Sequence, residues 1–506
     1  MSTPKEVGAV TSSSTTVPLR PWRRGVLPDA ALDQTYVRKA HTLNAAIQEI
    51  GMGSYQWSLF FVAGFGWCSD SLWQQVPGII LPVIIAELHP PRLEYLALAQ
   101  NLGLAAGSLI WGLGADIVGR RWVFNFTLLL AGLFGTAAGA SPSFAAMSVF
   151  VALWSVGVGG NIPVDTAVFL EFLPGSHQWL LAGMNLWWCL GQIIASGIAW
   201  PLLVHFSCKQ GELCEKRGNM GWRYYLYAMG GLTLLLFLLR FLAFTLHESP
   251  KFLMGRGNDL GAAAVVQKVA HHNGVDSSFS VEDLKALDLP QNSAPAASQP
   301  TSNGAHIRPL FATAELTRST LVIMLMWFLT GLGFPLYNAF LPYFLTRIGD
   351  AMNTSMSETF RNYLIILVMN IPGVALGTAA IEIPGVGRKG AMSFGAVLTG
   401  TFLLAGTTAR TSSALLGWNC AYAVAGTMMA AVMYAYTPEV FPTKHRGTGN
   451  GLAMTANRIG GILAPVIAMY ADLNTPVPVY IAGSMFIVAG GVMWLLPYES
   501  HRKTSL

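Results

Sequence analysis

The chain is 506 residues long, and 53% of its residues are hydrophobic while only 11% are charged. Soluble globular domains carry about 25% charged residues, so this composition excludes an ordinary soluble protein and indicates one that crosses a membrane many times. The net charge of +5 is spread over tails and short loops without a basic stripe, which argues against nucleic acid as a partner.

The first 54 residues are polar and rich in Ser and Thr, and they contain no apolar core of a cleavable signal peptide. We therefore predict a cytosolic N-terminal tail over residues 1–54. Apolar runs of about 20 residues, long enough to cross a bilayer, then recur along the chain. The first six are expected near residues 56–86, 94–114, 122–140, 145–170, 180–206 and 223–245.

A polar segment, residues 246–318, follows and includes LPQNSAPAASQPTSNGAH, whose composition is typical of disorder. We predict that it is a cytosolic linker. Six further spans are expected near residues 319–345, 361–381, 390–408, 414–437, 450–471 and 477–497, before a cytosolic tail at 498–506.

Spans of this length must satisfy their own backbone hydrogen bonds in hydrocarbon, so they are expected to be helices. The sequence therefore predicts an all-α membrane protein with twelve transmembrane helices in two six-helix bundles, residues 55–245 and 319–497. In proteins built from two such repeats, the solute site lies near the middle of the membrane between them.

The short loops predict the orientation of the chain. If the N-terminus is cytosolic, most loop cations lie on the cytosolic side, as the positive-inside rule requires. These cations are Arg120, Arg121, Lys251, Arg256, Arg388, Lys389, Lys444 and Arg446, with Arg502 and Lys503 in the final tail. The other side also carries cations, so the bias is moderate. We expect a monomeric plasma-membrane protein with both termini in the cytosol.

Three of the five cysteines, Cys68, Cys189 and Cys420, fall in apolar spans, where a thiol usually packs. Cys208 and Cys214 lie in the polar stretch SCKQGELCEKRGNMGWRY, which the predicted topology places outside the cytosol, where a disulfide can form. A disulfide and two free thiols are the alternatives. The stretch has too few further ligands for a metal site, and we expect no metal or other cofactor.

Two Gly-Arg turns, GADIVGRRW after the second span and IPGVGRKGA after the eighth, form an internal echo. The first turn, together with VGVGGNIPVD, HESPKFL and TPEVFPTKHRGTGNG, resembles the signature motifs of the major facilitator superfamily. The resemblance is to its sugar-porter side, in particular the synaptic-vesicle-protein-related branch. It implies the major facilitator fold and transport by alternating access. Val151 stands where members often carry an Arg, so the proton-coupling role of that Arg is not transferred to this chain.

The resemblance further implies a gate on the cytosolic side, formed by the repeated turns and by the motifs after the sixth and tenth spans. The gate residues are Gly112, Asp116, Gly119, Arg120, Arg121, Glu248, Arg388, Glu439 and Arg446. Single ion pairs at a wet interface are worth little, but a network that must break on opening makes a two-state latch. The alternative is that these cations only anchor the loops on the inner side.

Asp70 is a lone acid in the first span, where a carboxylate costs about 2.5–3.5 kcal/mol to insert. Trp67 and Trp73 lie three residues before and after it. We therefore expect all three side chains on one helical face that lines a central cavity. Asp70 would there take up a proton in each cycle or hold a polar solute. Alternatively, it lies in water near the outer interface or bonds a neighbouring helix.

Other polar and aromatic groups fall inside the spans that should be central. The residues expected to bind substrate or couple protons are Asp70, Trp73, Asn161, Asp165, Asn185, Trp188, Gln192, Tyr337, Asn338 and Arg458. Asp165 is equally a cavity acid or a structural partner, and intramembrane Trp residues are more often anchors than ligands. Gly333 and Pro335 should loosen the seventh helix before Tyr337, as broken helices at transport sites do.

Arg458 lies well inside the eleventh span, where an unpaired charge would be expensive. It is expected either to pair with Asp116 or Asp165, or to bind a carboxylate of the solute through its planar fork. Of the two interpretations, structural pairing is favoured.

These features predict a secondary active transporter of a small polar organic solute, sugar-like or an organic acid, coupled to protons. Its partners are then the solute, protons and the lipid bilayer. The chain has no Gly-x-x-x-x-Gly-Lys-Ser/Thr motif, and its ten His lie mostly in loops and tails, so neither a nucleotide-driven motor nor an enzyme is expected. A nutrient sensor without net transport and a facilitative uniporter are the alternatives.

Overall fold

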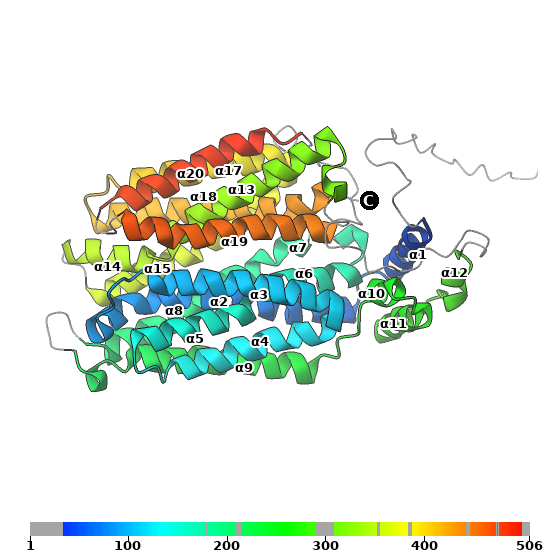
Figure 1. Cartoon of the computed structure of the whole chain (residues 1–506), viewed down its shortest axis with the longest axis horizontal. Helices are drawn as coiled ribbons and strands as arrows, with labels where there is room; N and C mark the ends of the chain where they lie inside the picture. The colour runs from blue at the N-terminus through cyan, green and yellow to red at the C-terminus, as the bar shows by residue number, and fades with distance from the viewer. Residues whose placement is uncertain are drawn as a thin grey trace, which may run out of the picture.

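The computed structural model describes residues 34–177, 180–208, 214–288, 308–351, 355–382, 387–441, 446–471, 473 and 475–497. All regular secondary structure in these residues is helical. The long helices form two layers, and a small group of short helices lies at one end (Figure 1).

The first half of the chain forms the lower layer in Figure 1. Its helices are α2 Ser54–Leu88, α3 Tyr95–Val118, α4 Arg120–Ala138, α5 Phe144–Val158, α6 Asn161–Phe172, η2 Gly175–His177, α7 Leu180–Gly183, α8 Asn185–Phe206, η3 Lys216–Gly218 and α9 Gly221–Ala243. The predicted fourth span is interrupted at Gly159 and Gly160, between α5 and α6.

The second half forms the other layer, with α13 and α17 to α20 prominent in Figure 1. Its helices are η4 Arg308–Phe311, α13 Ala314–Asn338, α14 Leu341–Ala351, α15 Met356–Val368, α16 Asn370–Glu382, α17 Gly387–Gly406, α18 Ser412–Val440, α19 Arg446–Tyr470 and α20 Val477–Trp494. The predicted seventh and eighth spans are each divided, between α13 and α14 and between α15 and α16.

Ten helical segments among the described residues are long and apolar enough to cross a membrane. Helices α3 and α17 occupy the two remaining predicted spans. The result agrees with the predicted all-α architecture of twelve transmembrane helices in two bundles. The exact domain limits proposed from the sequence stay a prediction.

Short polar side chains begin several of these helices. Ser143, Thr313 and Thr411 precede α5, α13 and α18, and each accepts a hydrogen bond from the backbone N–H three residues later. Ser355 and Glu358 form a reciprocal capping box at the start of α15. These caps satisfy backbone donors that the first turn of a helix leaves free.

The short helices at one end are α1 Gln34–Ile50, α10 Pro250–Gly255, α11 Asp259–His272 and α12 Val281–Lys285 (Figure 1). We refer to this end as the linker end and to the opposite end as the far end. Leu43 and Ile50 of α1 share a buried core with α11. Lys39 of α1 pairs with Asp259 at 2.5 Å and with Asp288 at 2.6 Å. The predicted N-terminal tail therefore contains a helix that is fastened to the linker.

Candidate functional site between the two halves

Asp70 lies in the middle of α2 and is completely buried. Its Oδ2 accepts a hydrogen bond from Nε2 of Gln74, one turn later, at 2.5 Å. Its Oδ1 has no hydrogen-bond partner among the described residues. The Asp70 carboxyl group interacts electrostatically with Arg458 and with Asp165. Because burying a polar oxygen without a partner is costly, this carboxyl group is a candidate for binding a proton or a solute.

Arg458 reaches toward the first half from α19. Its Nε donates a hydrogen bond to Oγ of Ser108 on α3 at 3.3 Å. No carboxylate among the described residues lies within ion-pair distance of its guanidinium. The neighbouring Asn457 donates to the backbone oxygen of Trp327 at 3.2 Å and so holds α19 against α13. A guanidinium has five N–H donors, so Arg458 keeps donors at the boundary between the halves that the described residues do not use.

Aromatic rings connect the two halves beside these charges. The Trp67 ring of α2 lies 5.7 Å from the Tyr434 ring of α18, measured between centroids. Tyr434 in turn packs edge-on against Trp327 of α13, at 4.9 Å. The Tyr434 hydroxyl interacts electrostatically with both Arg458 and Asp70, so these three side chains lie near one another.

Gln192 also lies at the boundary between the halves. Its Oε1 accepts a hydrogen bond from Nδ2 of Asn370, at the start of α16, at 2.7 Å. The amide oxygen of Asn370 accepts a hydrogen bond from Oγ1 of Thr427 on α18, also at 2.7 Å. Sequence reasoning singled out neither Asn370 nor Thr427. The hydrogen-bonded amides of Gln192 and Asn370 were therefore recognised only in the tertiary structure.

At the far end the two halves meet directly. A Cβ atom on Gly78 of α2 would lie 2.7 Å from the backbone oxygen of Ala339, between α13 and α14, so the approach requires glycine. The hydroxyl of Tyr363 on α15 donates a hydrogen bond to Oε1 of Gln75 on α2. We refer to these two contacts as the far-end closure, because they join α2 to the second half on that side of Asp70.

Asp165 of α6 is an ion-pair partner of Arg240 on α9, with Oδ2 and Nη2 2.8 Å apart and both side chains completely buried. Arg240 also donates to the backbone oxygens of Phe124 at 2.6 Å and Val62 at 3.2 Å. Of the two carboxylates offered from the sequence as partners of Arg458, Asp165 is therefore wrong, because α9 brings Arg240 to the depth of Asp165 inside the first half. Sequence reasoning missed Arg240, although a lone cation in the apolar run LLLFLLRFLAF was a usable signal.

Trp73 lies in the core of the first half. Its Nε1 donates to Oγ1 of Thr233 at 2.9 Å, and its ring packs on that of Trp154, with centroids 4.9 Å apart. The expectation that Trp73 shares a cavity-lining face with Asp70 is therefore wrong. With about 100° of rotation per residue, Trp67 and Trp73 stand about 120° apart on opposite flanks of Asp70.

Tyr337 and Asn338, at the end of α13, are hydrogen-bonded within the second half. The Tyr337 hydroxyl donates to Oδ1 of Asn419 at 2.7 Å, and Oδ1 of Asn338 accepts from the Tyr422 hydroxyl at 3.1 Å. These contacts hold α13 against α18 and do not join the two halves.

The remaining expected site residues belong to α6 and α8. Asn161 begins α6 and is completely buried, and its side chain has no hydrogen-bond partner among the described residues. Asn185 is buried at the start of α8. Trp188 is half-buried, and its backbone oxygen accepts a hydrogen bond from Ser71 of α2 at 2.6 Å. Asn161 therefore stays a candidate ligand, while the Trp188 contact holds α8 to α2.

At the linker end, residues expected to form the gate make two ion pairs, each within one half of the molecule. Arg120, which begins α4, pairs with Glu171 near the end of α6. Its backbone N–H also donates to Oε1 of Glu248 at 3.1 Å. Arg388 of α17 pairs with Glu439 of α18 at 2.8 Å. Glu171 is a partner that sequence reasoning did not assign to the gate.

Gly119 separates α3 from α4 with a φ of +106°, a conformation that favours glycine, and a Cβ there would lie 2.7 Å from Oε2 of Glu248. Gly112 has open space around its Cβ position, and Arg121 is exposed. The side chains of Asp116 and Arg446 lie outside the described part of the chain, so their expected gate contacts stay predictions.

Cys208 and Cys214, the two cysteines of the polar loop between α8 and α9, are joined by a disulfide. Of the alternatives left open by the sequence, the structure has the bridge. Cys68 and Cys189 are buried free thiols, as expected for cysteines in apolar spans.

His247, which follows α9, stacks on Tyr55 at the start of α2, with ring centroids 5.7 Å apart. Burial, followed by the charges of Lys268, Arg121 and His272, lowers the pKa of His247. His247 therefore binds a proton more readily in the unfolded chain than in the folded protein. The stabilising contribution is present above the ordinary histidine pKa of about 6.5 and is lost as the pH falls below it.

We expect the thermal unfolding temperature of the purified protein to decrease when the pH is lowered from about 7.5 to about 5.5. The decrease should be smaller in a His247→Asn variant. The matched control is His41→Asn, because His41 is an exposed histidine on α1. The same pH dependence in all three proteins would contradict this role of His247.

The chain matches the family model described as "Sugar (and other) transporter" over residues 52–504. The chain belongs to this family. A relative named "MFS siderochrome iron transporter 1", from Ceriporiopsis subvermispora (strain B), is 49% identical over 489 residues, covering 94% of this chain and 93% of that one. An uncharacterized MFS-type transporter from Schizosaccharomyces pombe is 47% identical over 500 residues, covering 93% and 90%.

Among solved structures, the xylose transporter XylE from E. coli in a partially occluded inward open conformation matches the transporter with a TM-score of 0.70. The match has 17% sequence identity and covers 89% of this chain and 100% of that one, so it shows the fold alone. Family and relatives together confirm a multi-pass membrane transporter with the major facilitator fold and not an enzyme.

Proposed function

We propose that this transporter moves a small organic acid by alternating access, together with a proton. The solute binds at the boundary between the halves, beside Asp70 and Arg458. One observation carries the proposal. Asp70 is completely buried, has one oxygen without a hydrogen-bond partner, and interacts electrostatically with Arg458. The described residues supply the Arg458 guanidinium with the hydroxyl of Ser108 and with no carboxylate.

The two side chains suggest how proton and solute are coupled. An ionised Asp70 attracts Arg458, while a protonated Asp70 leaves the guanidinium to a carboxylate of the solute, which it binds through charge-assisted hydrogen bonds. Proton and organic acid are then loaded together. The rings of Trp67 and Tyr434 offer apolar faces to the rest of the solute.

We further propose that the linker end faces the cytosol and the far end faces the outside. The bias of loop cations supports this orientation. The disulfide between Cys208 and Cys214 at the far end supports it as well, because such bonds persist in oxidising compartments.

A neutral sugar is the second candidate solute. Gln192, Asn370 and Thr427 place amide and hydroxyl groups at the boundary, which suit the hydroxyl groups of a sugar. The name of the relative from Ceriporiopsis adds a ferric siderochrome to the solutes to be compared.

The test is uptake into proteoliposomes that contain the purified transporter, with a panel of organic acids, pentoses, hexoses and a ferric siderochrome. We expect an organic acid to accumulate under an inward proton gradient and the accumulation to collapse with a protonophore. Uptake that is the same with and without the proton gradient would indicate a uniporter. Binding without flux would indicate a sensor.

Replacing Arg458 with Lys should raise KM for the organic acid on the order of tenfold, because an ammonium cannot form the two parallel hydrogen bonds of a guanidinium. Arg410→Lys, at an exposed arginine, is the matched control and should transport normally. A KM unchanged by Arg458→Lys would exclude a direct contact between this guanidinium and the solute.

A further inference from the structure

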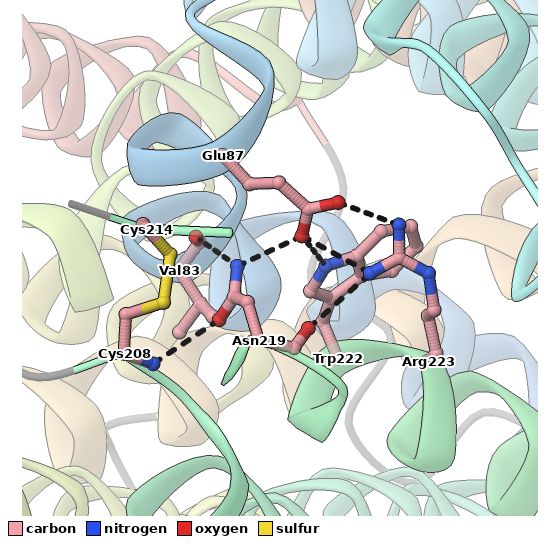
Figure 2. A network of polar contacts seen from close by, with 7 residues as sticks. All are labelled: Val83, Glu87, Cys208, Cys214, Asn219, Trp222 and Arg223. Carbon is pink, nitrogen blue, oxygen red and sulfur yellow. Dashed lines mark hydrogen bonds and ion pairs between the residues drawn. A yellow bond between two sulfur atoms is a disulfide. The ribbon is translucent and has the colours of Figure 1, made fainter. Parts of the chain in front are cut away.

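A buried polar cluster fastens the far end of α2 to α9 (Figure 2). Arg223 engages both oxygens of Glu87, with Nη2 2.6 Å from Oε1 and Nη1 3.0 Å from Oε2. Nε1 of Trp222 and Nδ2 of Asn219 each donate to Oε2 at 3.0 Å. Glu87 thus accepts four hydrogen bonds from one short stretch of chain. We refer to these four residues as the tip cluster.

The disulfide-bonded loop is attached to the same cluster. Oδ1 of Asn219 accepts a hydrogen bond from the backbone N–H of Cys208 at 3.4 Å, and Nδ2 of Asn219 also donates to the backbone oxygen of Val83 at 3.0 Å. Figure 2 shows the bond from Cys208 to Cys214 beside these contacts. One amide side chain therefore joins the loop, the backbone of α2 and the Glu87 carboxylate.

The hydrogen-bond ladder of α2 is weakened just before this cluster. Pro77 and Pro82 lie inside the helix and lack the N–H that would continue its hydrogen-bond ladder. The carbonyl of Trp73, which Pro77 leaves without its helical donor, accepts instead from Nε2 of Gln100 on α3 at 3.2 Å. Residues 78–88, which we refer to as the tip of α2, are thus connected to the rest of the helix by a weakened turn.

The tip of α2 also carries one side of the far-end closure, through the approach of Gly78 to the backbone of Ala339. The tip is therefore held by α9 and the disulfide loop as well as by the rest of α2. We propose that Glu87 is a positioning residue for transport: the tip cluster makes the tip of α2 move with the first half as one body when the far-end closure opens and shuts. This inference rests on the proposed alternating access.

The test measures distances between spin labels on the full-length protein in lipid nanodiscs, with the three free cysteines replaced by Ser. One label pair, Ala86→Cys with Arg361→Cys, spans the far end between exposed sites. A second pair, His271→Cys with Arg318→Cys, spans the linker end. Glu87→Gln keeps the size of the side chain and removes its charge. We expect it to broaden the far-end distance and add a longer component while the linker-end distance stays unchanged, because the tip then moves independently.

Glu215→Gln, an exposed acid of the same loop, is the matched control and should leave both distances as in the parent. Replacing Cys208 and Cys214 with Ser should reproduce the broadening on a smaller scale. If Glu87→Gln does not insert, Arg223→Lys is measured instead, because it keeps the charge and loses the fork. An unchanged far-end distance, or a joint change at both ends, would overturn the proposal. The rocking of the halves is tested separately, by reciprocal changes of the two distances in the parent protein when pH is varied.

Discussion

Replacing Asp70 with Asn is expected to abolish proton-driven uptake while the protein remains folded and inserted. Asn can still accept the hydrogen bond that Gln74 donates to this position, but it cannot bind and release a proton. The amide also carries no charge to attract Arg458. The measurement is accumulation of the solute in proteoliposomes under an inward proton gradient, with the amount of inserted protein determined in parallel.

Exchange of labelled for unlabelled solute, which requires no net proton movement, should persist in the Asp70→Asn variant. Asp276→Asn, at an exposed acid in the linker, is the matched control and should accumulate solute like the parent. Proton-driven accumulation that survives Asp70→Asn would exclude Asp70 as the coupling group. Loss of both accumulation and exchange would assign it to solute binding instead.

Replacing Arg240 with Met is expected to cost about 3–5 kcal/mol of stability, because it leaves the Asp165 carboxylate completely buried without its cation. The loss should be read as a lower unfolding temperature in detergent and as reduced yield of folded protein. The double variant, Asp165→Asn with Arg240→Met, should recover most of the loss, since neither buried charge remains.

Arg217→Met is the matched control for this change, because Arg217 is exposed in the loop between α8 and α9. It should leave the unfolding temperature unchanged. Equal unfolding temperatures for Arg240→Met and the parent would show that the pair of Asp165 and Arg240 is not structural. A double variant no better than Arg240→Met would show that the Met side chain itself disturbs the packing.

The family and the fold were accessible from sequence because their signals are local. The length of the apolar runs, the polar linker between two sets of six and the motif at Gly119 to Arg121 need no knowledge of what lies beside them in space. The same kind of reasoning singled out the loop of Cys208 and Cys214, but it left a disulfide and two free thiols as alternatives. It did not find α1, because an amphipathic helix within a polar tail lacks the long apolar run by which spans are recognised.

The candidate site was accessible only in part. Asp70 and Arg458 were found because a charge inside an apolar span is conspicuous wherever it points. The groups that surround them could not be predicted from the sequence, and Trp73 shows why. Closeness along a helix does not tell where a side chain points, and the Trp73 ring packs on Trp154 inside the first half. Gln192 was found, but its partner Asn370 begins a helix 178 residues later.

By itself, the sequence determined that this protein crosses the membrane in two sets of helices and carries a small number of buried charges. Only the tertiary structure decided which charges neutralise one another and which stay available. Asp165 forms an ion pair with Arg240, and Glu87 with Arg223, whereas Asp70 has no cation within ion-pair distance in the described part of the chain. The physical reason is that hydrophobic length and periodicity are properties of one helix, while the pairing of buried charges depends on the depth and rotation of two helices packed together.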